Sequence, residues 1–83
     1  VLFKMNIAII YIEQKKYNDA ISLLKKCVQE NPEIYELWYN LSIAYIHIDN
    51  YHKATRTIKH CLILSYNNPC NIELLSMLEE RRK

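Results

Sequence analysis

Apolar residues recur along this chain at steps of three or four, in five successive blocks separated by short polar breaks. The first block runs from Phe3 to Tyr11, and the third runs from Leu37 to Ile48. Side chains three and four positions apart lie on one face of an α-helix, so the pattern predicts five helices. The second, fourth and fifth blocks contain Ala20, Leu24, Cys27 and Val28, then Ala54, Ile58, Cys61 and Leu62, then Ile72, Leu75, Met77 and Leu78.

The sequence repeats itself with a period of 34 residues. Displacing the first 34 residues by this length aligns eight identical pairs with the second unit, without a gap. A fixed period in this range is typical of helical-repeat proteins, in which each unit is one supersecondary element. We therefore expect helix–turn–helix units over 1–34 and 35–68, and a capping helix over 69–83. The identical pairs are Asn6/Asn40, Ile9/Ile43, Tyr11/Tyr45, Ile12/Ile46, Tyr17/Tyr51, Ala20/Ala54, Lys25/Lys59 and Cys27/Cys61.

The predicted helix boundaries carry residues that favour turns and caps. Asn31-Pro32 and Asn68-Pro69 each read as an N-cap asparagine followed by proline at the first helical position. Asp49-Asn50 supplies residues that tolerate a left-handed turn between the two helices of the second unit. The corresponding residues of the first unit, Lys15-Lys16, are less suited to that turn.

Composition and charge exclude several classes of function. The 83 residues include no glycine, although average usage would give about six. Phosphate-binding loops, dinucleotide fingerprints and nucleophile elbows all need glycine, so these enzymes are excluded. Eleven Lys and Arg against nine Asp and Glu give no strongly basic character for nucleic acid. The longest apolar run, Ile7 to Ile12, is too short to cross a membrane.

The order of small, aromatic and large apolar residues within each unit resembles that of the tetratricopeptide repeat (TPR) family. The resemblance covers residues 1–68, and it departs from the family where Ala8 and Ser42 stand in place of glycine. It implies an all-α fold, a right-handed superhelix of five helices that acts as a protein-binding scaffold and not as an enzyme. The residues that carry it are Ile7, Ala8, Tyr11, Ala20, Leu24, Cys27 and Pro32, then Trp38, Leu41, Ser42, Tyr45, Ala54, Ile58 and Cys61.

By the same resemblance, the first helix of each unit lines a concave groove that binds a peptide or helix of a partner protein. This face is unusually apolar, and Asn6 and Asn40 are expected to hydrogen-bond the partner backbone. The alternative is that further repeats, or the capping helix, cover the face. The predicted groove residues are Met5, Asn6, Ile9, Ile12, Glu36, Tyr39, Asn40, Ile43, Ile46 and His47, extended by Leu2, Glu13, Glu73, Leu74 and Met77.

Three other functions are weighed against this one. A co-chaperone-like carboxylate clamp would use Asn6 and Asn40, but its cationic positions hold Leu2, Glu36, Cys70 and Leu74. An RNA-reading repeat would need a basic groove, which the sequence does not offer. Self-association into a dimer, through Phe3, Ile7 and Ile10 or through the groove, is the structural alternative.

No cofactor, metal or catalytic residue is predicted. His47, His52 and His60 are scattered over different helices and are expected at the surface, whereas Cys27 and Cys61 are expected to be buried. Cys70, near a helix start, is the one thiol expected to be more reactive. Three cysteines without paired spacing indicate reduced thiols, so we expect an intracellular, cytoplasmic protein. Because Val1 lies directly in an apolar helical pattern, we also expect a segment of a longer protein.

Overall fold

The computed structural model describes residues 2–64 and 69–81, which are helical except for short turns between the helices. Within these residues there are five helices and no strand, as the spacing of apolar residues predicts. The prediction of an all-α fold is therefore confirmed. The helices are α1 (Leu2–Glu13), α2 (Tyr17–Glu30), α3 (Tyr35–His47), α4 (Tyr51–Leu64) and α5 (Pro69–Arg81).

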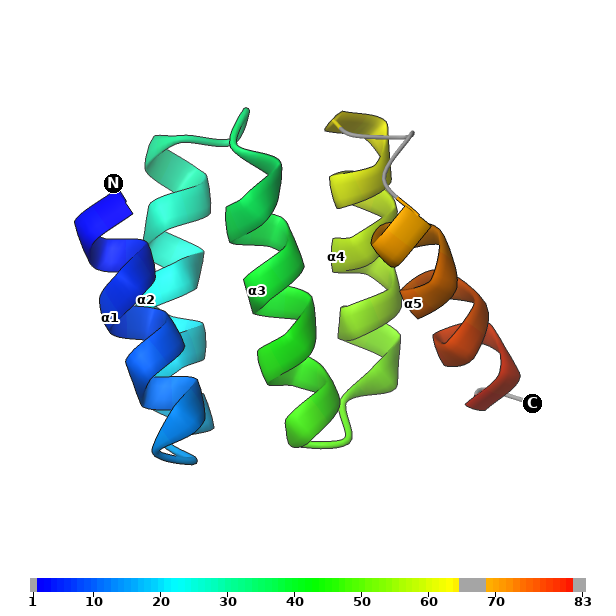
Figure 1. Ribbon diagram of the computed structural model, residues 1–83, viewed down its shortest axis with the longest axis horizontal. Coiled ribbons are helices and arrows are strands. Elements are labelled where there is room, and N and C mark those ends of the chain that lie inside the picture. The colour runs from blue at the N-terminus through cyan, green and yellow to red at the C-terminus, as the bar shows by residue number, and fades with distance from the viewer. Residues whose placement is uncertain (1, 65–68, 82–83) are drawn as a thin grey trace.

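The helices stack in chain order, each packed against the next (Figure 1). Consecutive helices run in opposite directions, so α1, α3 and α5 all run the same way and α2 and α4 run back. Helix α1 also touches α3, which places the first helices of the two units on one side of the stack. The result is two helical hairpins followed by a single closing helix.

A continuous core runs through the stack and is built from equivalent positions of the two units. Ala20 and Ala54 are both fully buried, as are Leu24 and Ile58, which are also separated by one repeat. Alanine at these positions lets two helices approach closely, because it adds only a methyl group between the backbones. Leu78 of α5 is completely buried as well, so the closing helix belongs to the same core.

The two cysteines that occupy the same position in each repeat are buried, as predicted. Cys27 and Cys61 both lie in the core. The Cys61 thiol donates to the carbonyl oxygen of Tyr35 over 3.3 Å, which links α4 to the start of α3. Cys70 follows the start of α5, but its side chain lies outside the described part of the chain.

The turns within both hairpins have the same geometry, with one residue in the left-handed region. Lys15 has φ 65° and Asp49 has φ 61°. The Lys16 N–H donates to the Tyr11 carbonyl over 2.8 Å, and the Lys15 N–H donates to the Ile12 carbonyl over 3.0 Å. These bonds define a Schellman motif, which satisfies carbonyl groups at the end of α1. The bonds from Asn50 to Tyr45 and from Asp49 to Ile46 repeat it at the end of α3.

The second hairpin turn is stabilised by side-chain hydrogen bonds that the first turn does not show at the equivalent cap position. The Asn50 side-chain oxygen accepts the Lys53 N–H over 3.4 Å and so caps α4. The Tyr51 hydroxyl donates to the Asp49 carboxylate over 2.9 Å. Lys16, the equivalent of Asn50, makes no such side-chain cap at α2. The sequence expectation that Lys15-Lys16 is the poorer turn agrees with this difference.

Replacing Lys15 by glycine is expected to raise the free energy of unfolding by about 0.5–1 kcal/mol. A side chain at positive φ costs about 1–2 kcal/mol, and glycine removes this cost but loses part of the gain through its larger unfolded-state entropy. Urea unfolding followed by circular dichroism measures the change. Lys16→Gly is the control, because Lys16 has φ −93° and gains no relief from strain. Equal effects of the two substitutions would contradict the argument.

The expected cap at Asn31-Pro32 is wrong. Asn31 instead ends α2, and its N–H donates to the Cys27 carbonyl over 2.8 Å. Helix α3 begins only at Tyr35, after Ile34 in an extended conformation. The additional residues allow Ile34 to pack against the core and let the Trp38 indole N–H donate to the Pro32 carbonyl over 2.9 Å. These contacts fix Pro32 in the turn and not in the helix.

At the second of these boundaries the proline prediction is confirmed. Pro69 is the first residue of α5, where its missing N–H removes no helical hydrogen bond. Asn68, the expected cap, lies outside the described residues.

Candidate protein-binding surfaces

The side of the stack formed by α1, α3 and α5 is the predicted groove, and we call it the groove face. A pocket of about 270 Å³ lies on it between α3 and α5. Tyr39 lines the pocket from α3, and Glu73, Leu74 and Met77 line it from α5. All four residues belong to the face predicted from the sequence. The structure brings them together at one hollow.

The predicted groove residues differ in how much surface they offer. Partly exposed positions combine contact with the core and access to a partner, while exposed ones offer most of their side chain to solvent or to a partner. Ile9, Ile12, Tyr39 and Ile46 pack on the core but keep part of their surface open. Asn40 and Ile43 are half-buried, and Asn6, Glu36 and His47 are exposed.

Met5 does not belong to this surface. Its side chain is only 8% exposed and is part of the core cluster. The helical spacing that places Met5 near Ile9 and Ile12 is compatible with a position on the groove face and with a position in the core. Near the start of α1, the rotation of the helix turns Met5 inward. We therefore leave Met5 out of the groove face.

The histidines are exposed, as expected, and two of them make ring contacts that the sequence analysis missed. His47 stacks on Tyr17 with ring centroids 4.6 Å apart and planes inclined by 4°, which joins the end of α3 to the start of α2. His60 lies against Trp38 at 4.0 Å, which joins α4 to α3. Helical periodicity predicts which face of its own helix a residue occupies. It does not predict which aromatic ring of another helix that residue contacts. The stacking of His47 on Tyr17 therefore connects the second hairpin to the first.

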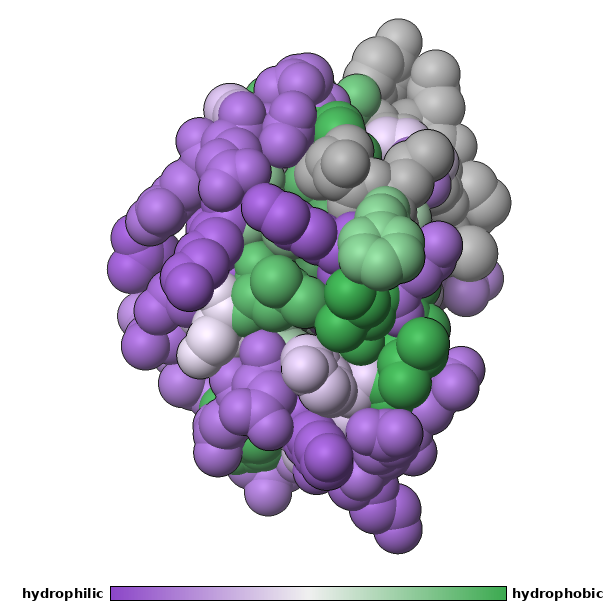
Figure 2. Space-filling model, turned by 90° about the vertical axis from the view of Figure 1, so that its left-hand side faces the viewer, coloured by the Kyte–Doolittle hydropathy of each residue, from purple (hydrophilic) through white to green (hydrophobic). Residues whose placement is uncertain are grey.

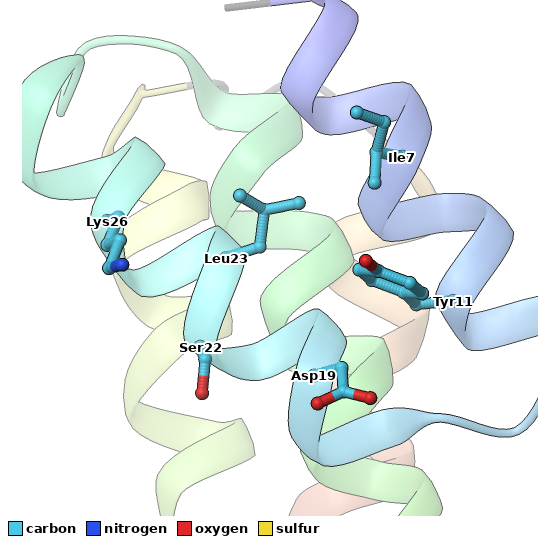
Figure 3. A pocket seen from close by; sticks show the side chains of 6 residues that line it. All are labelled: Ile7, Tyr11, Asp19, Ser22, Leu23 and Lys26. Atoms are coloured by element: carbon cyan, nitrogen blue, oxygen red, sulfur yellow. The ribbon is translucent and has the colours of Figure 1, made fainter.

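A second hollow lies at the end of the stack that α1 and α2 form (Figure 3). Figure 2 faces this end and shows a hydrophobic patch bordered by hydrophilic residues. Phe3 is 76% exposed and Ile10 is 49% exposed, both on α1. The hollow has a volume of about 360 Å³ and is lined by Ile7 and Tyr11 from α1 and by Asp19, Ser22, Leu23 and Lys26 from α2. We call this surface the end face.

The repeat explains why the end face is apolar. Adding one period to Phe3, Ile7 and Tyr11 gives Leu37, Leu41 and Tyr45. All three of these equivalents are buried in the second unit, where α2 packs against α3. The end face is therefore the same interhelical interface, left open in the first unit.

Residues 2–64 and 69–81 contain no group of three or more His, Cys, Asp or Glu side chains suited to a metal ion. Burial raises the pKa of the Cys27 thiol, which outweighs the opposing effect of the Lys4 charge. A raised pKa leaves the thiol protonated at neutral pH and therefore a weak nucleophile. Burial also raises the pKa of Tyr45.

Among the described residues, no helix has the length and apolar character required to cross a membrane.

The geometry defines a class of protein before any comparison is made. Repeated helical hairpins of 34 residues, stacked on a shared core, make up an α-helical repeat scaffold. The sequence profile of the family described as "Tetratricopeptide repeat" matches residues 11–62, more than half of the chain. The chain belongs to this family. Such repeats generally mediate protein–protein interaction and are typically not enzymes.

Solved structures agree on the fold. Two structures of MamA, one titled MamA AMB-1 and the other a MamA mutant, each superpose on this chain with a TM-score of 0.88. Each is 22% identical to this sequence, and the match covers 95% of this chain and 43% of the MamA chain. The likeness shows the fold alone, and the chain spans less than half the length of those proteins. No curated protein matches the sequence.

Proposed function

We propose that this chain is an intracellular, cytoplasmic protein-binding module and that its groove face binds an amphipathic helix or an apolar peptide. The observation that carries the proposal is the pocket between α3 and α5, where Tyr39, Leu74 and Met77 converge. An aromatic ring beside two flexible apolar side chains is a surface on which an apolar anchor of a partner can be buried. We assign no reaction and no cofactor to the module.

The residues next to the pocket extend the same surface. Ile43 lies one helical turn beyond Tyr39, and Ile9 lies at the equivalent position of α1. Both are partly exposed. A helix that places apolar side chains at successive turns would meet these isoleucines after filling the pocket. Asn6 and Asn40 flank them one turn earlier and offer amides for hydrogen bonds with the partner.

Ile9→Lys combined with Ile43→Lys is expected to weaken peptide binding by about a hundredfold, because two ammonium groups would lie in an apolar contact. The measurement is the fluorescence anisotropy of a labelled amphipathic helical peptide with a leucine stripe. Circular dichroism checks that the helical content is unchanged. Loss of the fold in this variant would instead show that both isoleucines belong to the core.

The matched control is Ile10→Lys combined with Ile48→Lys. It adds the same two charges at isoleucines that are exposed but lie outside the groove face. Peptide affinity is expected to stay within about twofold of the wild type, since surface substitutions away from the contact have small effects. Equal weakening by the two double variants would contradict binding at the groove face.

A second candidate function is self-association through the end face. The observation that favours it is the contrast between Phe3, which is 76% exposed, and its repeat equivalent Leu37, which is fully buried. A second copy that covered Phe3 and Ile10 would remove this apolar area from water. Light scattering at high micromolar concentration tests the idea, with Phe3→Glu and Ile10→Glu expected to dissociate the dimer. A wild-type monomer under these conditions would rule it out.

A further inference from the structure

The charges of this chain are separated between the two sides of the stack, although the whole chain carries a net charge of only +2. Helices α2 and α4 carry five lysine and arginine residues, all exposed, against two carboxylates, Asp19 and Glu30, so this side has a net excess of positive charge. Helices α1, α3 and α5, which form the groove face, carry mainly glutamate. The five cations of α2 and α4 are Lys25, Lys26, Lys53, Arg56 and Lys59.

Carboxylates lie directly beside the apolar part of the groove face. Glu73 lines the pocket together with Tyr39, Leu74 and Met77. Glu36 is exposed in the first turn of α3, one turn before Tyr39 and Asn40. Glu13 is exposed at the end of α1. A partner lying along the apolar surface would therefore meet negative charge at its edges.

The groove face offers little positive charge to offset these carboxylates. Lys4 is the only lysine or arginine among the described side chains of α1, α3 and α5. Its ammonium lies 3.6 Å from the Glu30 carboxylate on α2, so it is directed away from the groove face. His47, the remaining basic group on α3, is stacked on Tyr17.

We propose that the partner of the groove face is a basic amphipathic helix, with an apolar stripe flanked by lysine or arginine. This inference rests on the proposed function and names the chemistry of its ligand. The stripe fills the pocket and covers Ile43, while the flanking cations lie near Glu36 and Glu73. Opposite charge on the two surfaces speeds encounter and selects among apolar partners, because an acidic flank would be repelled.

Three synthetic peptides with the same leucine stripe test the proposal, their flanking positions being all lysine, all glutamine or all glutamate. The lysine peptide is expected to bind about tenfold more tightly than the glutamine peptide at low salt, and the glutamate peptide more weakly than either. Raising the salt concentration should reduce the difference, since exposed charges are screened. Glu36→Gln with Glu73→Gln should lower the affinity for the lysine peptide about fivefold. The affinity for the glutamine peptide should stay unchanged.

Asp19→Asn with Glu33→Gln is the matched control, because it removes two exposed carboxylates, one on α2 and one before α3, and changes the net charge equally. It is expected to leave the preference for the lysine peptide unchanged. If all three peptides bind equally, or if the control variant acts like the groove variant, the proposal of a basic partner fails and the binding groove stands. If no peptide binds, the proposed function fails as well.

Discussion

Replacing Leu37 by alanine is expected to lower the free energy of unfolding by about 4 kcal/mol. Leu37 is completely buried where α3 begins, and it belongs to the core that joins the two hairpins. Its truncation removes the transfer free energy of the lost methyl groups and leaves a cavity that the rigid helices fill only in part. Small domains have about 5–15 kcal/mol of stability, so the variant should lose a large share of it. Urea unfolding followed by circular dichroism measures the loss.

Phe3→Ala provides a control that the repeat itself supplies. Phe3 occupies the position of Leu37 one period earlier, yet its side chain is 76% exposed. Truncating an exposed side chain changes stability by only about 0.5 kcal/mol in a monomer. A loss at Phe3 as large as that at Leu37, measured at low protein concentration, would contradict the exposure of Phe3.

Leu78→Asp is expected to detach α5 from the stack and to lower stability by about 4 kcal/mol. Leu78 is the fully buried residue of α5, and a carboxylate in its place would be buried without a partner. In a repeat stack each unit depends mainly on its neighbour, so α1 and α2 should remain folded. Hydrogen exchange is expected to show loss of protection in α5 with slower exchange retained in α1 and α2.

Ser76→Asp is the control for this change. Ser76 lies two residues away on α5 and is exposed, so its replacement adds the same charge without burial. We expect its effect on stability to stay within about 0.5 kcal/mol. The Leu78 variant should also lose peptide binding, because Glu73, Leu74 and Met77 reach the pocket only when α5 is docked. Retained binding would contradict a pocket formed between α3 and α5.

The 34-residue repeat made it possible to predict the fold from the sequence. Eight identities at one fixed spacing, together with helical periodicity, predicted five helices, and the five helices are present in the described residues. Buried Cys27 and Cys61 followed from the same register. The start of α3 was misplaced because Trp38 bonds to the Pro32 carbonyl, a contact that depends on where two helices cross. A contact of this kind cannot be predicted from the identity of the cap residues alone.

The candidate surfaces were only partly predictable. The groove predicted from the sequence contained Tyr39, Glu73, Leu74 and Met77, and these four residues line one pocket in the structure. It also included Met5, which the rotation of α1 turns into the core. The separation of charge was missed because a sum over the chain cancels it. Assigning each lysine and glutamate to its own helix was the signal that would have shown it.

The packing of each helix mainly on its neighbour in sequence has a consequence for folding kinetics. Most contacts in such a stack close only short loops, so the chain has a low contact order. Helical proteins of this kind fold in microseconds to milliseconds, without a slow search for distant partners. Either hairpin can serve as the nucleus on which the next helix condenses. A change in the turn at Lys15 should therefore alter the folding rate only along routes that begin with the first hairpin.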